Sequence, residues 1–281
     1  MPTSLVASAC ANSLTTSSGA AITDSRMVEL SGIVASRAQA NVLWVHNDSG
    51  DSNRIFAIDS AGVTLSTFTI AGANAIDWED IGIGPGPSPG VDYLYVADVG
   101  DNLSTRSEVQ VYRFAEPTVP ATNTTVSVSG VETIRLQYPG GARDSEALIV
   151  DPRNGSLTLI EKKISGGTVG IYRAPANLAS GSLTTMSKVG SLKLPGGLFG
   201  AVTAADMSSD ATTLAIRTYG DLRLYQMLGP SAPVQVAFLT TPCIVAGPAE
   251  LQGEAIAFNS AGNQLITVSE GASQPLHFFA A

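Results

Sequence analysis

Short apolar runs separated by turn-forming residues recur along the chain, and this alternation is typical of β-strands rather than helices. In five places a run resembles the first strand of a repeated unit, and in three of them it begins with a glutamate. The five predicted first strands are Ser31–Val34, Glu79–Gly82, Glu146–Ile149, Ala205–Ser208 and Glu254–Ala257.

Further strands follow each first strand in a constant order. The second strands are Leu43–Asn47, Leu94–Asp98, Leu157–Glu161, Leu214–Thr218 and Leu265–Ser269. The third strands each carry an aromatic residue and are Arg54–Ile58, Val111–Arg113, Ile171–Arg173, Leu224–Gln226 and His277–Phe279. The fourth strands mostly alternate apolar and polar residues and are Val63–Ile70, Val131–Tyr138, Val189–Leu194 and Val234–Thr241.

This order predicts an all-β fold, a five-bladed β-propeller with one four-stranded blade per repeat. The fifth repeat ends after its third strand, and Ile22–Val28 would supply the missing strand and close the ring. Residues 1–21 are expected to form a residual signal or linker arm, and residues 22–281 a single propeller domain. A six-bladed ring and an irregular β-sandwich are the alternatives.

Composition agrees with a β-rich protein that does not bind nucleic acid. Only 14% of the residues are charged, and 28 glycines and 15 prolines supply turns. The formal net charge of -9 argues against nucleic acid, because its phosphates are neutralised by Lys and Arg. The apolar runs are too short for a transmembrane helix, so no membrane span is expected.

The N-terminal segment predicts export. Leu5–Ala11 looks like the tail of a secretory signal, and the small residues before Cys10 weakly resemble a bacterial lipoprotein cleavage site. We therefore expect a secreted, periplasmic or cell-surface bacterial protein. The sequence leaves open whether Cys10 pairs with Cys243 or, in a precursor, carries a lipid anchor.

The ring would bring the heads of the first strands and the tails of the second strands to one mouth of the channel. Glu79, Glu146 and Glu254 would meet there, and three carboxylates repel one another unless a cation or protons neutralise them. The oxygen-rich residues favour one central Ca²⁺, which Ser31 and Asn47 would also bind. An acidic channel without metal is the alternative.

Other polar residues at the mouth suggest catalysis. His46, Asp98 and Glu161 are the candidates for moving a proton, and Lys162 and Arg217 for steadying negative charge on a small-molecule substrate. The acidic turn Asn47–Asp51 is also expected to point one carboxylate inward, with Asp48 or Asp98 as the candidates. A monomer is expected.

Two resemblances accompany this interpretation. The segments Trp44–Asp51, Asp77–Ile81, Asp98–Asn102 and Ile171–Arg173 resemble a family of secreted bacterial β-propellers, which implies the fold and the secretion. The ring of Ser31 and three glutamates is similar to that of the calcium-dependent nucleotidases of the apyrase type, and implies that these four residues bind Ca²⁺. This chain departs from that pattern at Ala205, where Thr203 is the nearest substitute.

The six-bladed, paraoxonase-like lactonases and organophosphate hydrolases are similar in principle, because their axial calcium polarises a phosphoryl or carbonyl oxygen. The sequence therefore predicts a calcium-dependent hydrolase of phosphoesters, with an organophosphate triester (a phosphotriesterase reaction), a diester or a nucleotide as substrate. A lactonase or esterase at the same site, and a non-catalytic binding propeller with structural calcium, are the alternatives.

Overall fold

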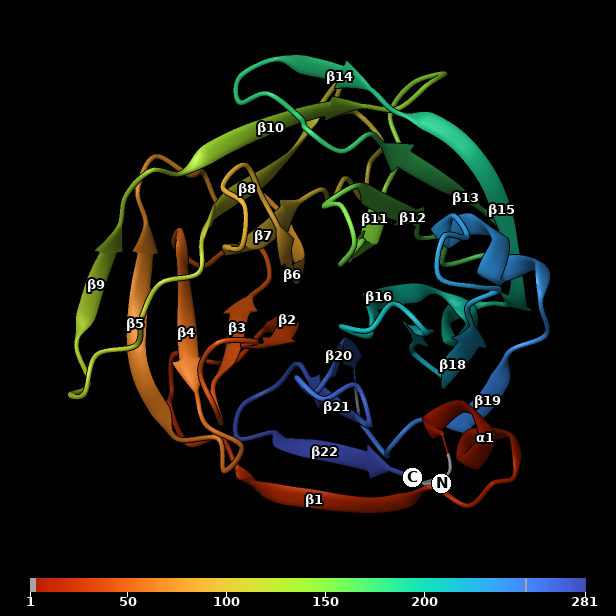
Figure 1. Cartoon of the computed structure of the whole chain (residues 1–281), viewed down its shortest axis with the longest axis horizontal. Coiled ribbons are helices and arrows are strands. Elements are labelled where there is room, and N and C mark those ends of the chain that lie inside the picture. Colours follow the sequence, from red (N-terminus) through yellow and green to blue (C-terminus); the bar gives the residue numbers. More distant parts are fainter. Residues whose placement is uncertain (1–3, 251) are drawn as a thin grey trace.

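Five β-sheets are arranged in a ring in the computed structural model, which describes residues 4–250 and 252–281 (Figure 1). The axial region between their inner strands is called the channel. This arrangement confirms the five-bladed β-propeller. Each inner strand packs against the inner strands of the two neighbouring blades, and β20 of blade 5 meets β2 of blade 1, which closes the ring.

Each blade begins with an inner strand at the channel, and its other strands follow outward. Blade 1 contains β2 (Leu30–Ala35), β3 (Leu43–Asn47), β4 (Arg54–Ile58), β5 (Thr64–Ile70) and β9 (Thr125–Val128). Blade 2 contains β6 (Trp78–Pro85), β7 (Asp92–Asp98), β8 (Val109–Ala115), β10 (Glu132–Gln137) and β14 (Leu183–Thr185). Blade 3 contains β11 (Ser145–Val150), β12 (Leu157–Glu161), β13 (Gly166–Ala174) and β15 (Ser187–Gly196).

Blade 4 contains β16 (Val202–Met207), β17 (Thr213–Thr218), β18 (Asp221–Gln226) and β19 (Cys243–Ala246). Blade 5 contains β20 (Gly253–Phe258), β21 (Gln264–Ser269), β22 (Pro275–Ala280) and β1 (Thr15–Ala21). Apolar side chains of adjacent blades form the hydrophobic cores between them. The predicted third-strand aromatics contribute to these cores, and the buried ones are Phe56, Tyr112, Tyr172, Tyr225 and Phe279.

The ring is closed by an N-terminal strand, but not by the predicted one. β1 (Thr15–Ala21) pairs antiparallel with β22, so the closing strand lies in the segment expected to be a linker. Ile22 and Met27 are apolar because their side chains enter the core between blades 5 and 1, rather than because they alternate along a strand. The helix α1 (Leu5–Cys10) packs its Leu5 against blades 4 and 5, so the arm is part of the fold.

Two outer features also differ from the sequence prediction. The segment expected to form the fourth strand of blade 4 contains the 3₁₀ helix η2 (Val234–Leu239), and β19 takes the outer position instead. β9 and β14 each cross to the preceding blade and add a fifth strand in parallel, to β5 and to β10 respectively. A second 3₁₀ helix, η1 (Leu198–Gly200), precedes β16.

A disulfide bond between Cys10 and Cys243 ties α1 to β19, across 233 residues of sequence. Of the two alternatives that the sequence left open for Cys10, the structure therefore contains the pairing with Cys243. Within residues 4–250 and 252–281, helices are all too short to cross a membrane.

The disulfide is expected to stabilise the closed ring. In a Cys10→Ser, Cys243→Ser variant we expect the free energy of unfolding to fall by about 2–5 kcal/mol, because the bond restricts the unfolded chain over a long loop. Urea denaturation with and without a reducing agent measures this, and the variant itself should not respond to the reductant. Equal stability of the variant and the oxidised protein would contradict the prediction.

Candidate metal centre

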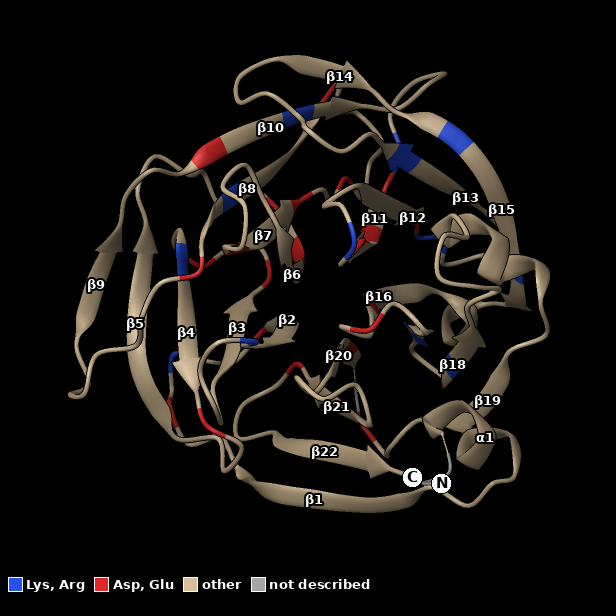
Figure 2. Cartoon of the chain, viewed as in Figure 1, with Lys and Arg blue, Asp and Glu red and all other residues tan. Residues whose placement is uncertain are grey.

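Every inner strand carries a β-bulge at its second residue. The pairing with the second strand shifts at this point in all five blades, for example between Trp78 and Asp80 in blade 2. A bulge adds one unpaired residue and re-aims its side chain. The five bulge residues are Ser31, Glu79, Glu146, Thr203 and Glu254. All five side chains are buried at the inner strands, and acidic residues gather around the channel (Figure 2).

The three glutamates therefore occupy equivalent positions, as predicted. In blade 4 the equivalent residue is Thr203 rather than Ala205, so the predicted alignment is wrong there by two residues. The mismatch arose because Asp206 imitates the acidic residue of the pattern. Asp206 lies deeper in the ring, where its carboxylate accepts the N–H of Phe258 at 2.8 Å. Blade 4 has no gap in the polar ring.

Ser31 and Thr203 link neighbouring blades. The Ser31 hydroxyl donates to the carbonyl oxygen of Glu79 at 2.6 Å, and the Thr203 hydroxyl donates to that of Gly253 at 2.9 Å. Each bond joins an inner strand to that of the next blade. Ser31 therefore connects blades 1 and 2, and its role as a metal ligand stays a prediction.

Asn47 is also occupied by the fold. Its Oδ1 accepts the N–H of Glu29 at 3.2 Å, and its Nδ2 donates to the carbonyl of Arg26 and to Asp51, both at 2.7 Å. The side chain is 5% exposed. Both ends of the amide therefore hold the turn after β3, and the role of Asn47 as a calcium ligand stays a prediction.

The residues that follow the second strands reach the channel instead. The first-to-second strand pairing continues one step beyond these strands, as in the bonds from Asp48 N–H to the Glu29 carbonyl and from Lys162 N–H to the Asp144 carbonyl. Side chains alternate along a strand, so these residues point opposite to the strand-end residues. The channel-facing residues of this second ring are Asp48, Lys162, Tyr219 and Glu270.

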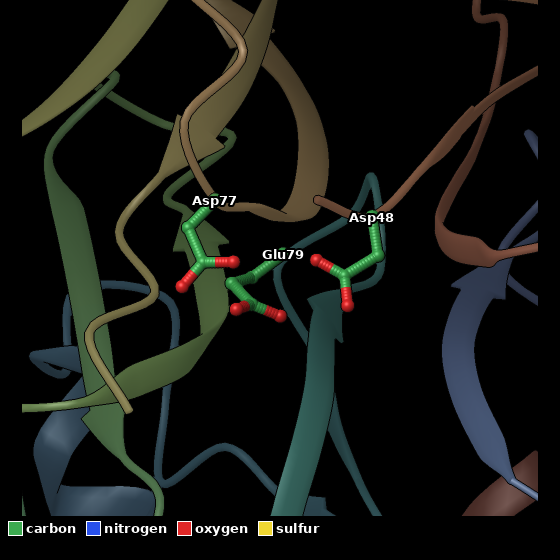
Figure 3. Close-up of side chains that lie close together, drawn as sticks. All are labelled: Asp48, Asp77 and Glu79. Carbon is green, nitrogen blue, oxygen red and sulfur yellow. The ribbon is translucent and has the colours of Figure 1, made fainter. Parts of the chain in front are cut away.

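On one side of the mouth, three carboxylates converge. Oxygen atoms of Asp48, Asp77 and Glu79 lie within 4.8 Å of one another, and the three side chains point toward a common space (Figure 3). Gly100 makes room for them, because a Cβ at this position would overlap the carboxylates of Glu79 and Asp77. The inward-pointing Asp48 was predicted, whereas Asp77 was not.

On the other side, a lysine and a tyrosine contact the remaining glutamates. Lys162 forms an ion pair with Glu146, and its Nζ lies 3.2 Å from the hydroxyl of Tyr219. The Tyr219 hydroxyl in turn donates to Glu254 at 2.6 Å. The second carboxylate oxygens of Glu146 and Glu254 are buried and have no hydrogen-bond partner among the described residues.

Burial, and then repulsion between neighbouring carboxylates, raises the pKa values of the acids at the mouth. Burial, and then the charges of Glu146 and Asp48, raise the pKa of Glu79 well above its usual value. Burial and the neighbouring charges raise the pKa of Asp77 to about 6 and that of Glu270 to about 8. The glutamates thus interact as the sequence predicts, and the mouth requires protons or a cation.

His46 does not reach the mouth, which corrects its predicted role. Its side chain is fully buried, and its ring lies where a Cβ on Gly32 would be. The ring meets Trp78 edge-on, with 5.7 Å between centroids. Burial lowers the pKa of His46 to about 4. This neutral imidazole fills the contact between blades 1 and 2.

Asp98 and Glu161 are also turned into their blades. Asp98 is fully buried, pairs with Arg106 at 2.9 Å and holds the loop that follows β7. Glu161 accepts the N–H of Gly170 at 2.7 Å and lies 3.3 Å from Lys163. Both residues end second strands, so the alternation that brings their successors to the channel carries them away from it.

Arg217 lies between blades 4 and 5. It is 2% exposed, forms an ion pair with Glu250 and donates to the carbonyl of Ala255 at 3.0 Å. A Cβ on Gly253 would overlap its guanidinium. Of the five predicted catalytic residues, Lys162 is the one that the structure places at the mouth.

The fold and this acidic mouth define the class of protein, a five-bladed β-propeller with a polar ring at one end of its channel. No protein-family model matches the chain, and a search of curated proteins finds no match.

Without a bound cation, we expect stability to fall as the pH rises. Carboxyl groups with raised pKa values keep their protons in the folded state at pH values where the unfolded chain has lost them. The unfolded state then binds fewer protons, so the free energy of unfolding decreases with pH. The loss begins near the usual carboxyl pKa of about 4 and extends through the values of about 6 for Asp77 and about 8 for Glu270.

Thermal melts in EDTA between pH 5 and pH 8 test this expectation. The melting temperature should fall over this range, and millimolar Ca²⁺ should reverse most of the fall at pH 8. A melting temperature that rises with pH in EDTA would show that the mouth carboxylates do not oppose folding.

Proposed function

We propose that this protein is a secreted, calcium-dependent hydrolase that acts on phosphoesters at the channel mouth. The observation that carries the proposal is the convergence of Asp48, Asp77 and Glu79, whose oxygens lie within 4.8 Å of one another. Oxygens that bind one Ca²⁺ at about 2.3–2.6 Å lie up to about 5 Å apart. The site lies beside Lys162 and Tyr219, which suit an anionic group.

The chemistry of the donors supports calcium over zinc. The three residues offer carboxylate oxygen, the ligand that Ca²⁺ prefers, whereas zinc sites favour nitrogen and sulfur. The two histidines lie elsewhere: His46 is buried between blades, and Nδ1 of His277 lies 2.8 Å from the hydroxyl of Ser18. The disulfide supports secretion, because such bonds persist in oxidising compartments.

The residues at the mouth have separate roles in the proposed hydrolysis. Asp48, Asp77 and Glu79 would hold the calcium ion, which would supply Lewis-acid polarisation of a phosphoryl oxygen. Lys162 has three N–H donors and uses two on Glu146 and Tyr219, so the third is available to a substrate oxygen. Glu270 is the carboxyl group we assign to accept a proton from water. Burial and then the charges of Glu254 and Asp48 raise its pKa to about 8, so it accepts the proton in its ionised form, near pH 8 and above.

An apolar lip beside Tyr219 favours a substrate with an alkyl or aryl group. Phe199 is 74% exposed, Leu198 50% and Ile164 57%. The loops that carry them are joined by the bond from Gly197 N–H to the Ser165 carbonyl, at 3.1 Å. Such exposed apolar side chains next to a polar site suit an amphiphilic ligand.

One observation favours the alternative of a binding propeller with structural calcium. Three pockets of about 330, 510 and 560 Å³ are lined by residues outside the mouth, such as Tyr95, Thr16 and Arg173. A cation at the mouth would then hold the blades together without turnover.

Hydrolysis of chromogenic phosphate monoesters, diesters, triesters and lactones, with and without EDTA, tests the proposal. We expect EDTA-sensitive turnover of a phosphoester. Glu79→Gln should weaken calcium binding by at least about tenfold, because it removes one charged ligand, and should lower turnover in step. Glu29→Gln is the matched control, because Glu29 is exposed and outside the triad. If no compound is turned over but EDTA lowers the melting temperature strongly, the structural-calcium alternative is correct.

The apolar lip gives a separate prediction about substrate binding. Phe199→Ala should raise KM for an aryl phosphoester about tenfold, since losing an apolar contact worth about 1.4 kcal/mol changes affinity by that factor. Calcium affinity and kcat should change little. Leu239→Ala is the control, because Leu239 is 82% exposed and lies on η2. Equal effects of the two substitutions would show that the lip does not bind substrate.

A further inference from the structure

Lys162 places a positively charged ammonium group in the polar ring. It follows β12 directly, its side chain is 8% exposed, and it forms an ion pair with Glu146 of the neighbouring strand. Its Nζ also lies 5.2 Å above the ring centre of Tyr219 from blade 4. One ammonium group therefore contacts residues of two blades at the channel.

The surroundings keep this ammonium group charged. Lys162 is buried together with the carboxylate of Glu146, which forms an ion pair with its ammonium group. A buried lysine without such partners would tend to lose its proton. Lys162 thus neutralises charge in the half of the ring that lacks the carboxylate triad.

The same half holds unsatisfied oxygen atoms. Oε2 of Glu146 and Oε2 of Glu254 are buried without a hydrogen-bond partner among residues 4–250 and 252–281. The two side chains are 3% and 4% exposed. Buried carboxylate oxygens are normally paired. This half therefore has carboxylate oxygens that neither Lys162 nor Tyr219 contacts and that could bind a cation.

We propose that the ammonium group of Lys162 acts as a resident cation for Glu146 and Glu254, and that it thereby limits the mouth to one divalent cation. Without this lysine, Glu146, Glu254 and the hydroxyl of Tyr219 form a second divalent-cation site. The count of one ion in the wild type rests on the proposed function, whereas the second site does not.

The number of bound calcium ions tests the inference. Lys162→Met removes the charge and keeps much of the volume, and should bind one more Ca²⁺ than the wild type. Lys162→Arg keeps the charge and should bind the wild-type number. Lys163→Met is the matched control, because Lys163 is the adjacent residue, is 40% exposed and pairs with Glu161. Isothermal titration calorimetry and native mass spectrometry after removal of metal give the counts.

A double variant, Lys162→Met with Glu146→Gln, should return to the wild-type number, because it removes a ligand of the second site. An unchanged count in Lys162→Met overturns the inference. If the wild type binds no ion and Lys162→Met binds one, the proposed function fails while this inference stands. If the wild type and Lys162→Met each bind one ion, this inference fails while the proposed function stands.

Folding of the variants is checked by circular dichroism. Should Lys162→Met not fold without metal, it and Lys162→Gln are refolded in millimolar Ca²⁺ and counted by native mass spectrometry, with one extra ion expected. Failure of both to fold in calcium, while Lys162→Arg folds, overturns the inference, because the second ion would replace the lost charge.

Discussion

Closing a ring of sheets leaves the inner strands with one unpaired edge each, and satisfying these edges constrains the rest of the channel. An inner strand is paired only with the second strand of its own blade, so its other backbone N–H groups face the axis. Asp80 supplies acceptors for two of them. Its fully buried carboxylate accepts the N–H of Leu148 at 2.9 Å and that of Ala205 at 3.2 Å, and so joins blades 2, 3 and 4. Asp206 accepts the N–H of Phe258 in the same way and joins blades 4 and 5.

This solution places carboxyl groups near the axis, where burial disfavours their charged form. Burial raises the pKa of Asp80 well above its usual value and that of Asp206 to about 6. The bulge glutamates then add further carboxylates to a channel that already disfavours them. Lys162 relieves this repulsion on the side of Glu146, and the carboxyl groups on the side of Glu79 require protons or a cation. The division of the mouth into two halves therefore follows from the low number of basic residues that reach the axis.

The repeat could be predicted from the sequence because its signals are local. Each blade has an aromatic third strand and turn-forming residues between strands, and these patterns survive without sequence identity. The closing strand could not be predicted in this way. Thr15–Ala21 consists of Thr, Ser, Gly and Ala, and nearly all its side chains are exposed. It joins the sheet through backbone hydrogen bonds at an edge, where side-chain alternation is not required. Such a strand resembles a linker in sequence.

Asn47 and Glu161, which were predicted for the mouth, lie one residue away from Asp48 and Lys162, which reach it, and the reason is the period of a strand. A shift of one residue turns a side chain to the opposite face, so the ends of the second strands face the blades and their successors face the channel. Thus Glu161 is turned into its blade, away from the channel, and Lys162 reaches the mouth. The bulge moves Glu79 out of the regular alternation, and it therefore meets Asp77, which precedes β6, and Asp48, which follows β3. Of the three carboxylates that converge, Asp48 and Asp77 therefore flank strand ends, whereas Glu79 is the bulge residue within β6.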